Sequence, residues 1–346
     1  MKNIKQTYLI TGAAGFIGSN LTEAILSEGH QVVGLDNFAT GFRKNIEPFL
    51  DNPDFTFIEG DIRDYADCEK AVEGVDYVLH QGALGSVPRS IADPMASNDT
   101  NVGGTVNMMF AAKEAGVKRF VYASSSSVYG DHPTLPKIEH NTGKALSPYA
   151  ISKATDEVYA RNFSELYGLE TVGLRYFNVF GPRQDPNGAY AAVIPKWVKQ
   201  LLDHEQPVIN GDPTYSRDFT YIKNVIRANL QAATRPSESI KAGRKKYYEQ
   251  QGLPFKEQDT IAEAVNIAYG GRTSLKELFS ALRNALADYD PKIAGLDYIL
   301  GDFRPGDIPH SNADITKAKT LLDYHPQYDA RTGFQNACQW YWENMK

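Results

Sequence analysis

The sequence predicts an α/β fold, with a doubly wound parallel sheet and a smaller mixed α/β domain after it. Short apolar runs alternate with segments of helical periodicity through the first half of the 346 residues. Such alternation is typical of parallel strands joined by crossover helices. A glycine-rich turn separates the first apolar run from the first helical segment. After Gly181 and Pro182 the alternation gives way to loops and short helices punctuated by proline, which indicates a second part of the fold.

Each expected element follows from the spacing of its apolar residues. In the first helix, Ile17, Leu21 and Ile25 fall on one face. We expect strands over residues 8–11, 31–35, 55–58, 77–80, 119–123, 171–175 and 264–269. We expect helices over residues 17–27, 102–115, 149–167, 275–287 and 315–322.

The chain divides by composition near residue 180. We expect residues 1–180 to form the sheet domain, with segments near 221–235 and 263–271 returning to it. Residues 181–346 are expected to form most of the smaller domain. The stretch 241–259 is polar and charged, and we interpret it as an exposed excursion to which the sequence assigns no role.

Charge and cysteine content narrow the class of protein. The net charge of −6 argues against nucleic acid or an anionic membrane surface as the main partner. We find no secretory apolar segment near the N-terminus and no apolar run that approaches the ~20 residues of a membrane span. Cys68 and Cys338 have no metal-ligand spacing, so we expect two reduced thiols and no metal site. We therefore expect a cytoplasmic protein.

Gly12, Gly15 and Gly18 form a Gly-x-x-Gly-x-x-Gly turn between the first strand and the first helix. Glycines in such a turn let the backbone approach a pyrophosphate, and the N-terminus of the helix supplies N–H donors. Asp36 closes the second strand, where a carboxylate accepts hydrogen bonds from a ribose 2′-hydroxyl and repels a 2′-phosphate. The pattern predicts a Rossmann sheet that binds NAD rather than NADP. Further cofactor contacts are expected at Phe16, Ile17, Asn37, Gly41, Asp61, Ile62, Gln81 and Ala83.

A serine-rich segment, Ser124–Ser127, follows the fifth expected strand, and Tyr149 and Lys153 lie on the long helix after it. A Tyr-x-x-x-Lys pair shares one helical face, about one turn apart. A phenol with a reference pKa near ~10 is a poor base at neutral pH, but a neighbouring ammonium favours the phenolate. These residues predict a proton-transfer site.

With the glycine turn, Asp36, the serine segment and the Tyr-x-x-x-Lys pair in this order, the chain resembles the extended short-chain dehydrogenase/reductase family. Within it the chain is most similar to the UDP-hexose 4-epimerases, in particular the UDP-N-acetylglucosamine 4-epimerase group. The resemblance implies bound NAD, a UDP-sugar substrate bound by the second domain, and a homodimer joined through the helices 102–115 and 149–167. Four further motifs carry the resemblance over nearly the whole chain: residues 98–105, 175–182, 215–219 and 304–307.

The resemblance also implies catalytic roles. Tyr149 would take the proton of the sugar 4-hydroxyl while hydride leaves C4, and the resulting 4-keto sugar would turn over before hydride returns. Lys153 would favour the phenolate and bind the nicotinamide ribose. Asn101 matches an asparagine on the preceding helix, which we expect to support the cofactor site. The position of the catalytic hydroxyl matches Ser125, with Ser126 beside it, but the choice among the four serines stays open.

For the substrate, the resemblance implies that Arg217 and Arg304 bind the diphosphate, because a guanidinium pairs with two phosphate oxygens. Asp307 matches an acid that binds the uridine ribose, and Asn178 matches an asparagine that contacts phosphate or sugar. Ser311 stands where glucose-restricted epimerases have tyrosine, so a small residue leaves room for a 2-acetamido group. The other implied substrate contacts are Ser86, Arg89, Ser125, Ser126, Ala192, Val193 and Trp197.

These features predict reversible C4 epimerisation of UDP-N-acetylhexosamines for surface-polysaccharide synthesis, with UDP-glucose and UDP-galactose as further substrates. Three alternatives stay open: a nucleotide-sugar dehydratase or decarboxylase, a dehydrogenase that releases NADH, and a non-catalytic NAD-binding protein. A dehydratase needs a further acid after the active hydroxyl, but Ser126 and Ser127 occupy those positions. A non-catalytic relative is expected to lose Tyr149 or Lys153, and this chain keeps both.

Overall fold

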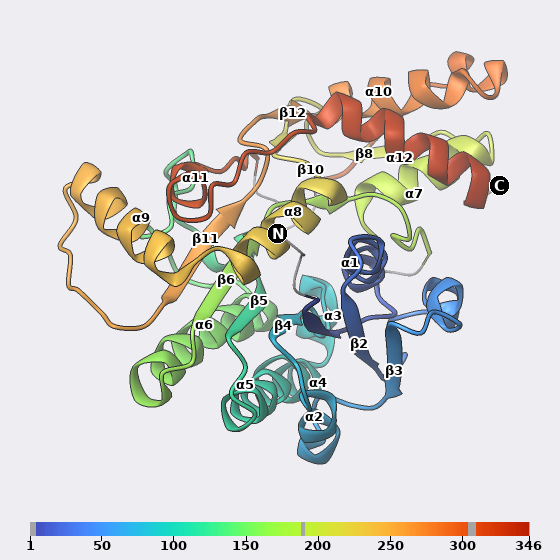
Figure 1. The fold of residues 1–346 in the computed structure, drawn as a ribbon. Helices are drawn as coiled ribbons and strands as arrows, with labels where there is room; N and C mark the ends of the chain where they lie inside the picture. Colours follow the sequence, from blue (N-terminus) through green and yellow to red (C-terminus); the bar gives the residue numbers. More distant parts are fainter. Residues whose placement is uncertain (1–4, 188–190, 304–308, 346) are drawn as a thin grey trace.

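The computed structural model describes residues 5–187, 191–303 and 309–345. Its centre is a seven-stranded sheet in the order β3-β2-β1-β4-β5-β6-β11 (Figure 1). Neighbouring strands all run parallel, which confirms the predicted doubly wound fold. The strands are β1 Thr7–Thr11, β2 Gln31–Asp36, β3 Phe55–Glu59, β4 Tyr77–His80, β5 Arg119–Ser125, β6 Thr171–Tyr176 and β11 Ala262–Ile267.

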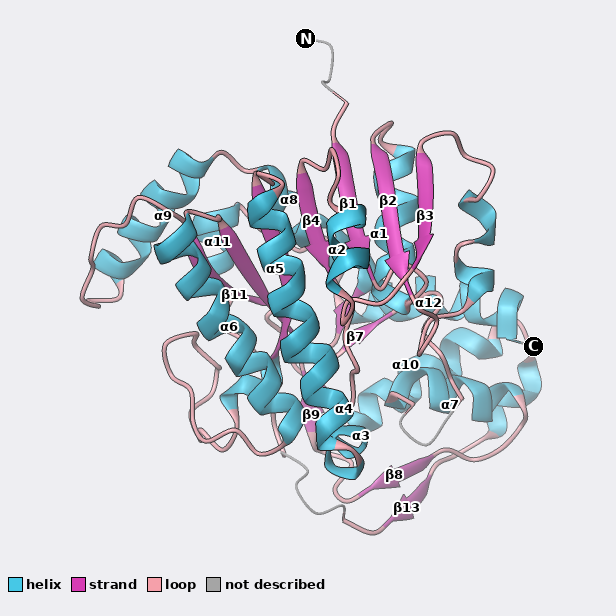
Figure 2. Cartoon of the chain, turned by 90° about the horizontal axis from the view of Figure 1, so that it is seen from below, coloured by secondary structure: helices cyan, strands magenta, loops and turns pink. Residues whose placement is uncertain are grey.

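Helices cover both faces of the sheet. Figure 1 shows α1 and α8 above it and α2, α5 and α6 below it, and Figure 2 views the sheet from the side of the second group. Successive strand residues point to opposite faces, so Ile10 packs in the core with α1 and α8, whereas Leu9 packs with α2, α5 and α6. The helices are α1 Phe16–Ser27, α2 Tyr65–Ala71, α5 Gly104–Glu114, α6 Pro148–Tyr167 and α8 Ile222–Thr234.

Two short helices, separated by the non-helical Asp93, and a π-helical segment precede α5. They are α3 Val87–Ala92, α4 Pro94–Asn98 and the π-helical segment Asp99–Gly103. The single helix expected over residues 102–115 therefore begins as a π-helical turn, a feature that occurs often at functional sites.

The C-terminal half supplies helices and short strand pairs of mixed direction. The pairs β7–β10 and β8–β13 are parallel, and β9–β12 is antiparallel. β11 and α8 arise from the segments expected to return to the sheet, while the division into two domains stays a prediction. The elements are β7 Val179–Phe180, α7 Val193–Leu202, β8 Val208–Asn210, β9 Ser216–Arg217, β10 Thr220–Tyr221, β12 Thr273–Ser274, α10 Leu275–Ala287, β13 Ile299–Gly301 and α12 Ala330–Met345.

The interpretation of residues 241–259 as an exposed excursion is wrong for its first half. Residues Ser237–Gln250 form helix α9, which packs against α11 (Thr316–Leu322). On the inner face of α9, Arg244 is 4% exposed and Tyr247 is 2% exposed. The Arg244 guanidinium donates to the main-chain carbonyls of Gln258 (2.9 Å) and Thr260 (3.2 Å). The charged side chain is tolerated in the interior because these carbonyls accept from its terminal nitrogens and the Glu263 carboxylate lies 3.7 Å from its Nε.

Both cysteines are free thiols in the interior. Burial raises the pKa of Cys68 and of Cys338 to about 12. Across the described part of the chain, we find no helix with the length and apolar character needed to cross a bilayer.

Candidate functional site

The glycine turn joins β1 to α1 at the carboxyl edge of the sheet. Gly12 has a φ of +67°, a left-handed conformation that favours glycine. A Cβ on Gly18 would lie 2.1 Å from the carbonyl oxygen of Gly12, so α1 approaches the turn more closely than a side chain would allow. No side chain caps the N-terminus of α1, which leaves this end of the helix available to an anion.

A cavity of about 390 Å³ lies against this turn. Its position and its glycine walls fit a dinucleotide, because the backbone can approach a phosphate where no Cβ intervenes. Of the cofactor residues expected from the sequence, Gly12, Gly15, Phe16, Ile17, Gly18, Asp36, Asn37, Ile62, Gln81 and Ala83 line it. Sequence reasoning missed other lining residues, among them Thr40, Arg63, Leu84 and Thr100.

The Asp36 carboxylate is buried at the rim of this cavity, with 7% of the residue exposed. One oxygen accepts a hydrogen bond from the Ala14 N–H (2.9 Å) and the other from the Phe38 N–H (2.7 Å). Burial raises the pKa of Asp36, and these two N–H groups oppose the rise. Each carboxylate oxygen can accept a second hydrogen bond, so Asp36 can accept hydrogen bonds from ribose hydroxyls, as expected.

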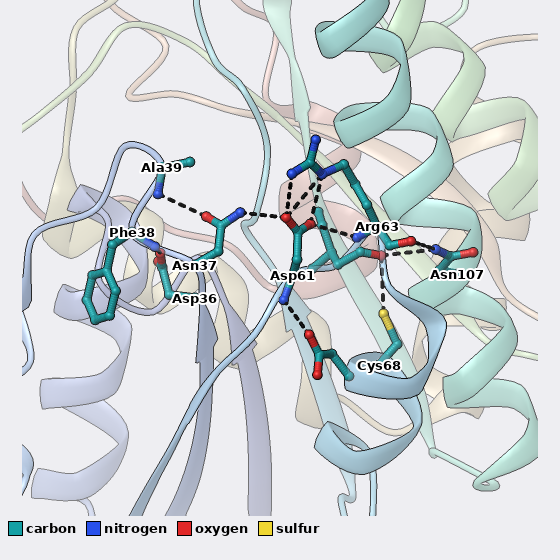
Figure 3. A network of polar contacts seen from close by, with 10 residues as sticks. Asp36, Asn37, Phe38, Ala39, Asp61, Arg63, Cys68 and Asn107 are labelled. Carbon is teal, nitrogen blue, oxygen red and sulfur yellow. Dashed lines mark hydrogen bonds and ion pairs between the residues drawn. The ribbon is translucent and has the colours of Figure 1, made fainter.

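Asp61 lies beside Asn37 and supports two residues of the cavity wall (Figure 3). The Asn37 amide donates to Asp61 Oδ2 (2.8 Å), and Arg63 donates to the same carboxylate through Nε (3.0 Å) and its terminal nitrogen (2.6 Å). The hydrogen bond from Arg63 lowers the pKa of Asp61 to about 2. The ionised carboxylate therefore fixes both Asn37 and Arg63, which line the cavity.

Gly41 and Asn101 hold neighbouring segments in place. A Cβ on Gly41 would lie 2.9 Å from Ala14, so glycine lets its loop lie against the turn. Asn101 is fully buried in the π-helical segment. Its side chain accepts from the Leu84 N–H (2.7 Å) and donates to the Leu84 carbonyl (3.2 Å) and the Ser152 hydroxyl (3.0 Å). Asn101 thereby joins the loop after β4 to α6.

Tyr149 and Lys153 lie in the first turns of α6. Ser147 caps this helix by accepting a hydrogen bond from the Ala150 N–H (3.1 Å), a favourable helix start. The Tyr149 N–H donates to the hydroxyl of Ser90 in α3 (3.0 Å). The helix that carries the tyrosine is therefore fixed to the segment that follows β4.

The Lys153 ammonium is buried and lies 3.2 Å from Asp156 Oδ2. Burial raises the pKa of Asp156 to about 6, against the opposing effect of Lys153. His80, at the end of β4, is held between the hydroxyls of Thr11 (2.8 Å) and Thr105 (3.1 Å). Burial lowers the pKa of His80 to about 3, and the charge of Lys153 acts in the same direction. The histidine is therefore neutral at physiological pH.

The four serines differ in their surroundings. They lie at the end of β5 and the start of the 3₁₀ segment Ser126–Tyr129. Ser124 is buried and donates to Glu157 (2.6 Å). Ser125 Oγ accepts a hydrogen bond from the Ser127 N–H (3.1 Å), so the hydroxyl proton of Ser125 can be donated to a ligand. The buried Ser127 hydroxyl has no partner among the described residues. Ser124 is engaged in the interior, so Ser125 is better placed to meet a substrate.

Arg217 and Ser311 come together from segments far apart in sequence. The Ser311 N–H donates to the Ser216 carbonyl (3.0 Å). Arg217 donates to that same carbonyl and to a second one in the segment that precedes Ser311, both at 3.0 Å. Two of the expected substrate residues are therefore neighbours, while Arg304 and Asp307 lie outside the described residues.

The other expected substrate residues come from three segments. Ser86 caps α3 by accepting the N–H of Arg89 (3.3 Å). Asn178 follows β6 with a φ of +39°, and its side chain donates to a main-chain carbonyl (3.2 Å). Trp197 in α7 is 3% exposed and its indole N–H donates to a main-chain carbonyl (3.3 Å), as a core residue does. The start of α7 supplies Ala192 and Val193.

The model of the NAD dependent epimerase/dehydratase family matches residues 8–245, more than half of the chain. The chain belongs to this family. It is 32% identical over 339 residues to a UDP-glucose 4-epimerase of Mycolicibacterium smegmatis, a match that covers 96% of this chain and 97% of the relative. The family and the geometry of the glycine cavity agree on NAD as the cofactor.

Two solved structures have the same fold along nearly the whole chain. The UDP-N-acetylglucosamine 4-epimerase of Methanobrevibacter ruminantium, in complex with UDP-N-acetylmuramic acid, superposes with a TM-score of 0.85 at 36% identity and covers 99% of both chains. The UDP-glucuronic acid 4-epimerase of Bacillus cereus, in complex with UDP-glucuronic acid and NAD, has a TM-score of 0.80 at 29% identity, covering 98% of this chain and 99% of the other.

Proposed function

We propose that the chain is a UDP-sugar 4-epimerase that interconverts UDP-N-acetylglucosamine and UDP-N-acetylgalactosamine, with UDP-glucose and UDP-galactose as further substrates. The observation that carries the proposal is the pairing of Tyr149 with a buried Lys153 on one face of α6, in a chain whose glycine turn borders a cavity that fits NAD. A synthetic role in supplying precursors for surface polysaccharide follows from these sugars.

In this proposal the residues around Tyr149 move one proton. Tyr149 removes the proton of the sugar 4-hydroxyl, and the positive charge of Lys153 favours the phenolate that does so. The Ser125 hydroxyl, whose proton is free for a ligand, donates to the sugar oxygen. NAD, when bound, supplies the acceptor and donor of the hydride at C4. The sugar ring turns over as a 4-keto species, and Tyr149 returns the proton.

Epimerisation is favoured over dehydration by the residues beside the catalytic hydroxyl. Loss of water from C5 and C6 needs an additional acid and base. Positions 126 and 127 are serines, and the Glu157 carboxylate nearby is bound by Ser124 and Arg175. The Glu157 carboxylate is thus engaged within the protein, which favours the single proton transfer at C4.

The acetamido preference rests on Ser311. Its N–H is fixed to Ser216, next to Arg217, the side chain that we assign to the diphosphate. A small residue here leaves space at C2 of the hexose. The solved structure with 36% identity is a UDP-N-acetylglucosamine 4-epimerase, which supports the same choice. A uronic acid substrate, as bound by the Bacillus cereus enzyme, would instead need a cation at C6.

We further propose that two copies of the chain associate through α5 and α6. The outer side of these helices carries large exposed apolar side chains, and such a patch is typical of an interface. The exposed fraction is 64% for Val158 and 65% for Leu166. Sedimentation velocity would show a dimer, and a Val158→Glu/Leu166→Glu variant should be a monomer. A wild-type chain that stays monomeric at micromolar concentration would contradict this interface.

The substrate is tested by incubating purified protein, loaded with NAD, with UDP-N-acetylglucosamine and following the sugar protons by NMR. We expect the C4-inverted product to reach an equilibrium mixture from either side. The Tyr149→Phe variant is the control for contaminating activity. Stoichiometric accumulation of NADH would indicate a dehydrogenase, and loss of the 6-hydroxyl would indicate a dehydratase. Turnover of UDP-glucose alone would contradict the acetamido preference.

A further inference from the structure

Lys153 has a partner that the proposed proton transfer does not use. Its Nζ lies 3.2 Å from Asp156 Oδ2, with the side chains 3% and 1% exposed. The two residues are three positions apart on α6, so they lie on the same side of the helix. The charged group that acts on Tyr149 is therefore one half of an ion pair in the interior.

Such a pair is costly unless it is well placed. Removing an ammonium from water carries a large desolvation cost, which a carboxylate in contact offsets. The desolvation cost of the Asp156 carboxylate is only partly compensated, because its Oδ1 accepts no hydrogen bond from the described residues. The hydroxyl of Thr105 faces Asp156, but its proton goes to the Asn101 carbonyl (2.5 Å). A buried carboxylate left in this condition points to a role other than stability.

The other titratable groups around the pair cannot take the place of Asp156. His80 on β4 is neutral and bound to two threonine hydroxyls. Glu157, the next residue on α6, is bound by Ser124 and by two nitrogens of Arg175. Tyr122 on β5 is buried and its pKa is raised by burial. Among the described groups, Asp156 is the carboxylate in contact with Lys153.

We propose that Asp156 is a positioning residue that keeps Lys153 charged and in one place, one helical turn from Tyr149. The inference rests on the proposed function, because it assumes that Tyr149 and Lys153 act in catalysis. Asp156 itself does not contact the substrate in this scheme. It acts through Lys153, whose ammonium it holds by a contact of 3.2 Å.

The first test is a double-mutant cycle read by thermal unfolding, without substrate or cofactor. The variants are Lys153→Met, Asp156→Asn and the double variant. We expect Lys153→Met to lower the Tm more than the double variant does, because it alone leaves an unpaired buried carboxylate. The control is the exposed pair Lys241–Glu238, which has the same spacing at 3.0 Å on α9. Its cycle, Lys241→Met with Glu238→Gln, should be additive.

The second test compares kcat with KM. Asp156→Asn should lower kcat by at least ~10-fold with less change in KM, since the lysine has lost the carboxylate that holds it in place. Asp156→Glu, which restores the carboxylate, should recover most of the lost kcat. A merely structural residue would lower the Tm without this separation of kcat from KM.

The outcomes separate the two proposals. Additive Tm changes for Lys153→Met and Asp156→Asn would overturn the pairing. If Asp156→Asn fails to fold, a Lys153→Met variant with the wild-type Tm would overturn it. A wild-type kcat in a folded Asp156→Asn variant would overturn the positioning role. Failure to invert C4 in the wild-type chain would refute the proposed function, and the Tm cycle would still report on the ion pair.

Discussion

Replacing Gly18 with alanine should weaken NAD binding by about 10²-fold. The new Cβ would lie 2.1 Å from the Gly12 carbonyl oxygen, whereas real Cβ atoms essentially never come closer than 3.0 Å. The turn and α1 must therefore separate by roughly 0.9 Å at this point. A shift of that size moves the backbone N–H groups that would contact the pyrophosphate. Loss of one or two hydrogen bonds to a charged group, each worth about 1.5–3 kcal/mol, corresponds to that loss of affinity.

Stability should change less than affinity. Crowding of the backbone should lower the free energy of unfolding by about 1–3 kcal/mol. The better helix propensity of alanine should offset about 1 kcal/mol of this loss. The matched control is Gly103→Ala, because Gly103 is also helical and a Cβ there would meet nothing within 4 Å. That variant should keep its NAD affinity and gain stability slightly. The assay is isothermal titration of the cofactor-free protein with NAD, together with thermal unfolding.

Either of two results would refute this reasoning. If the NAD affinity of Gly18→Ala stays within threefold of the wild-type affinity while its Tm falls, then the close approach of α1 to the turn serves packing and not cofactor binding. If both variants lose affinity equally, then the clash at Gly12 is not the cause.

Three further predictions concern the reaction, the substrate and the pH. Tyr149→Phe should fold, bind NAD and lose at least ~10²-fold in kcat, because the general base is gone; turnover near the wild-type rate would contradict the assignment. Ser311→Tyr should reduce kcat/KM for the acetamido sugars more than for UDP-glucose, and an equal loss on both would exclude Ser311 as a determinant. The pKa of Asp61 is lowered by Arg63 to about 2, so its ionised form contributes stability above about pH 4 that disappears as the pH falls through about 2. Asp61→Asn should therefore be less stable than the wild type at pH 7, with a difference that shrinks in acid. Urea unfolding at several pH values would measure it, and a difference that does not change with pH would contradict the role of the charge.

The sheet and the cofactor turn could be predicted because local patterns determine them. The strand at Thr7–Thr11, the turn at Gly12 and the helix from Phe16 follow one another directly in the sequence. Each satisfies its own backbone requirements, so no distant contact is needed to recognise them. The same holds for Tyr149 and Lys153, whose spacing places them on one face of α6.

Helix α9 could not be predicted in this way. Its composition indicates an exposed segment, yet Arg244 is buried because carbonyls of the following loop and Glu263 of β11 lie around it. Those partners come from outside the helix, and composition does not contain them. Asp156 is an intermediate case, since its spacing of three from Lys153 was visible in the sequence, whereas the burial of both residues was not.

The two buried cysteines make the chain suitable for site-directed labelling. Thiol reagents react with the thiolate, and burial holds the pKa of Cys68 and of Cys338 near 12. A maleimide at neutral pH should therefore leave both native thiols unmodified. A single cysteine introduced at an exposed position, such as Leu300 on β13 at 62% exposure, would carry the only fluorophore. The natural chain can thus be labelled on β13 without removing its own cysteines first.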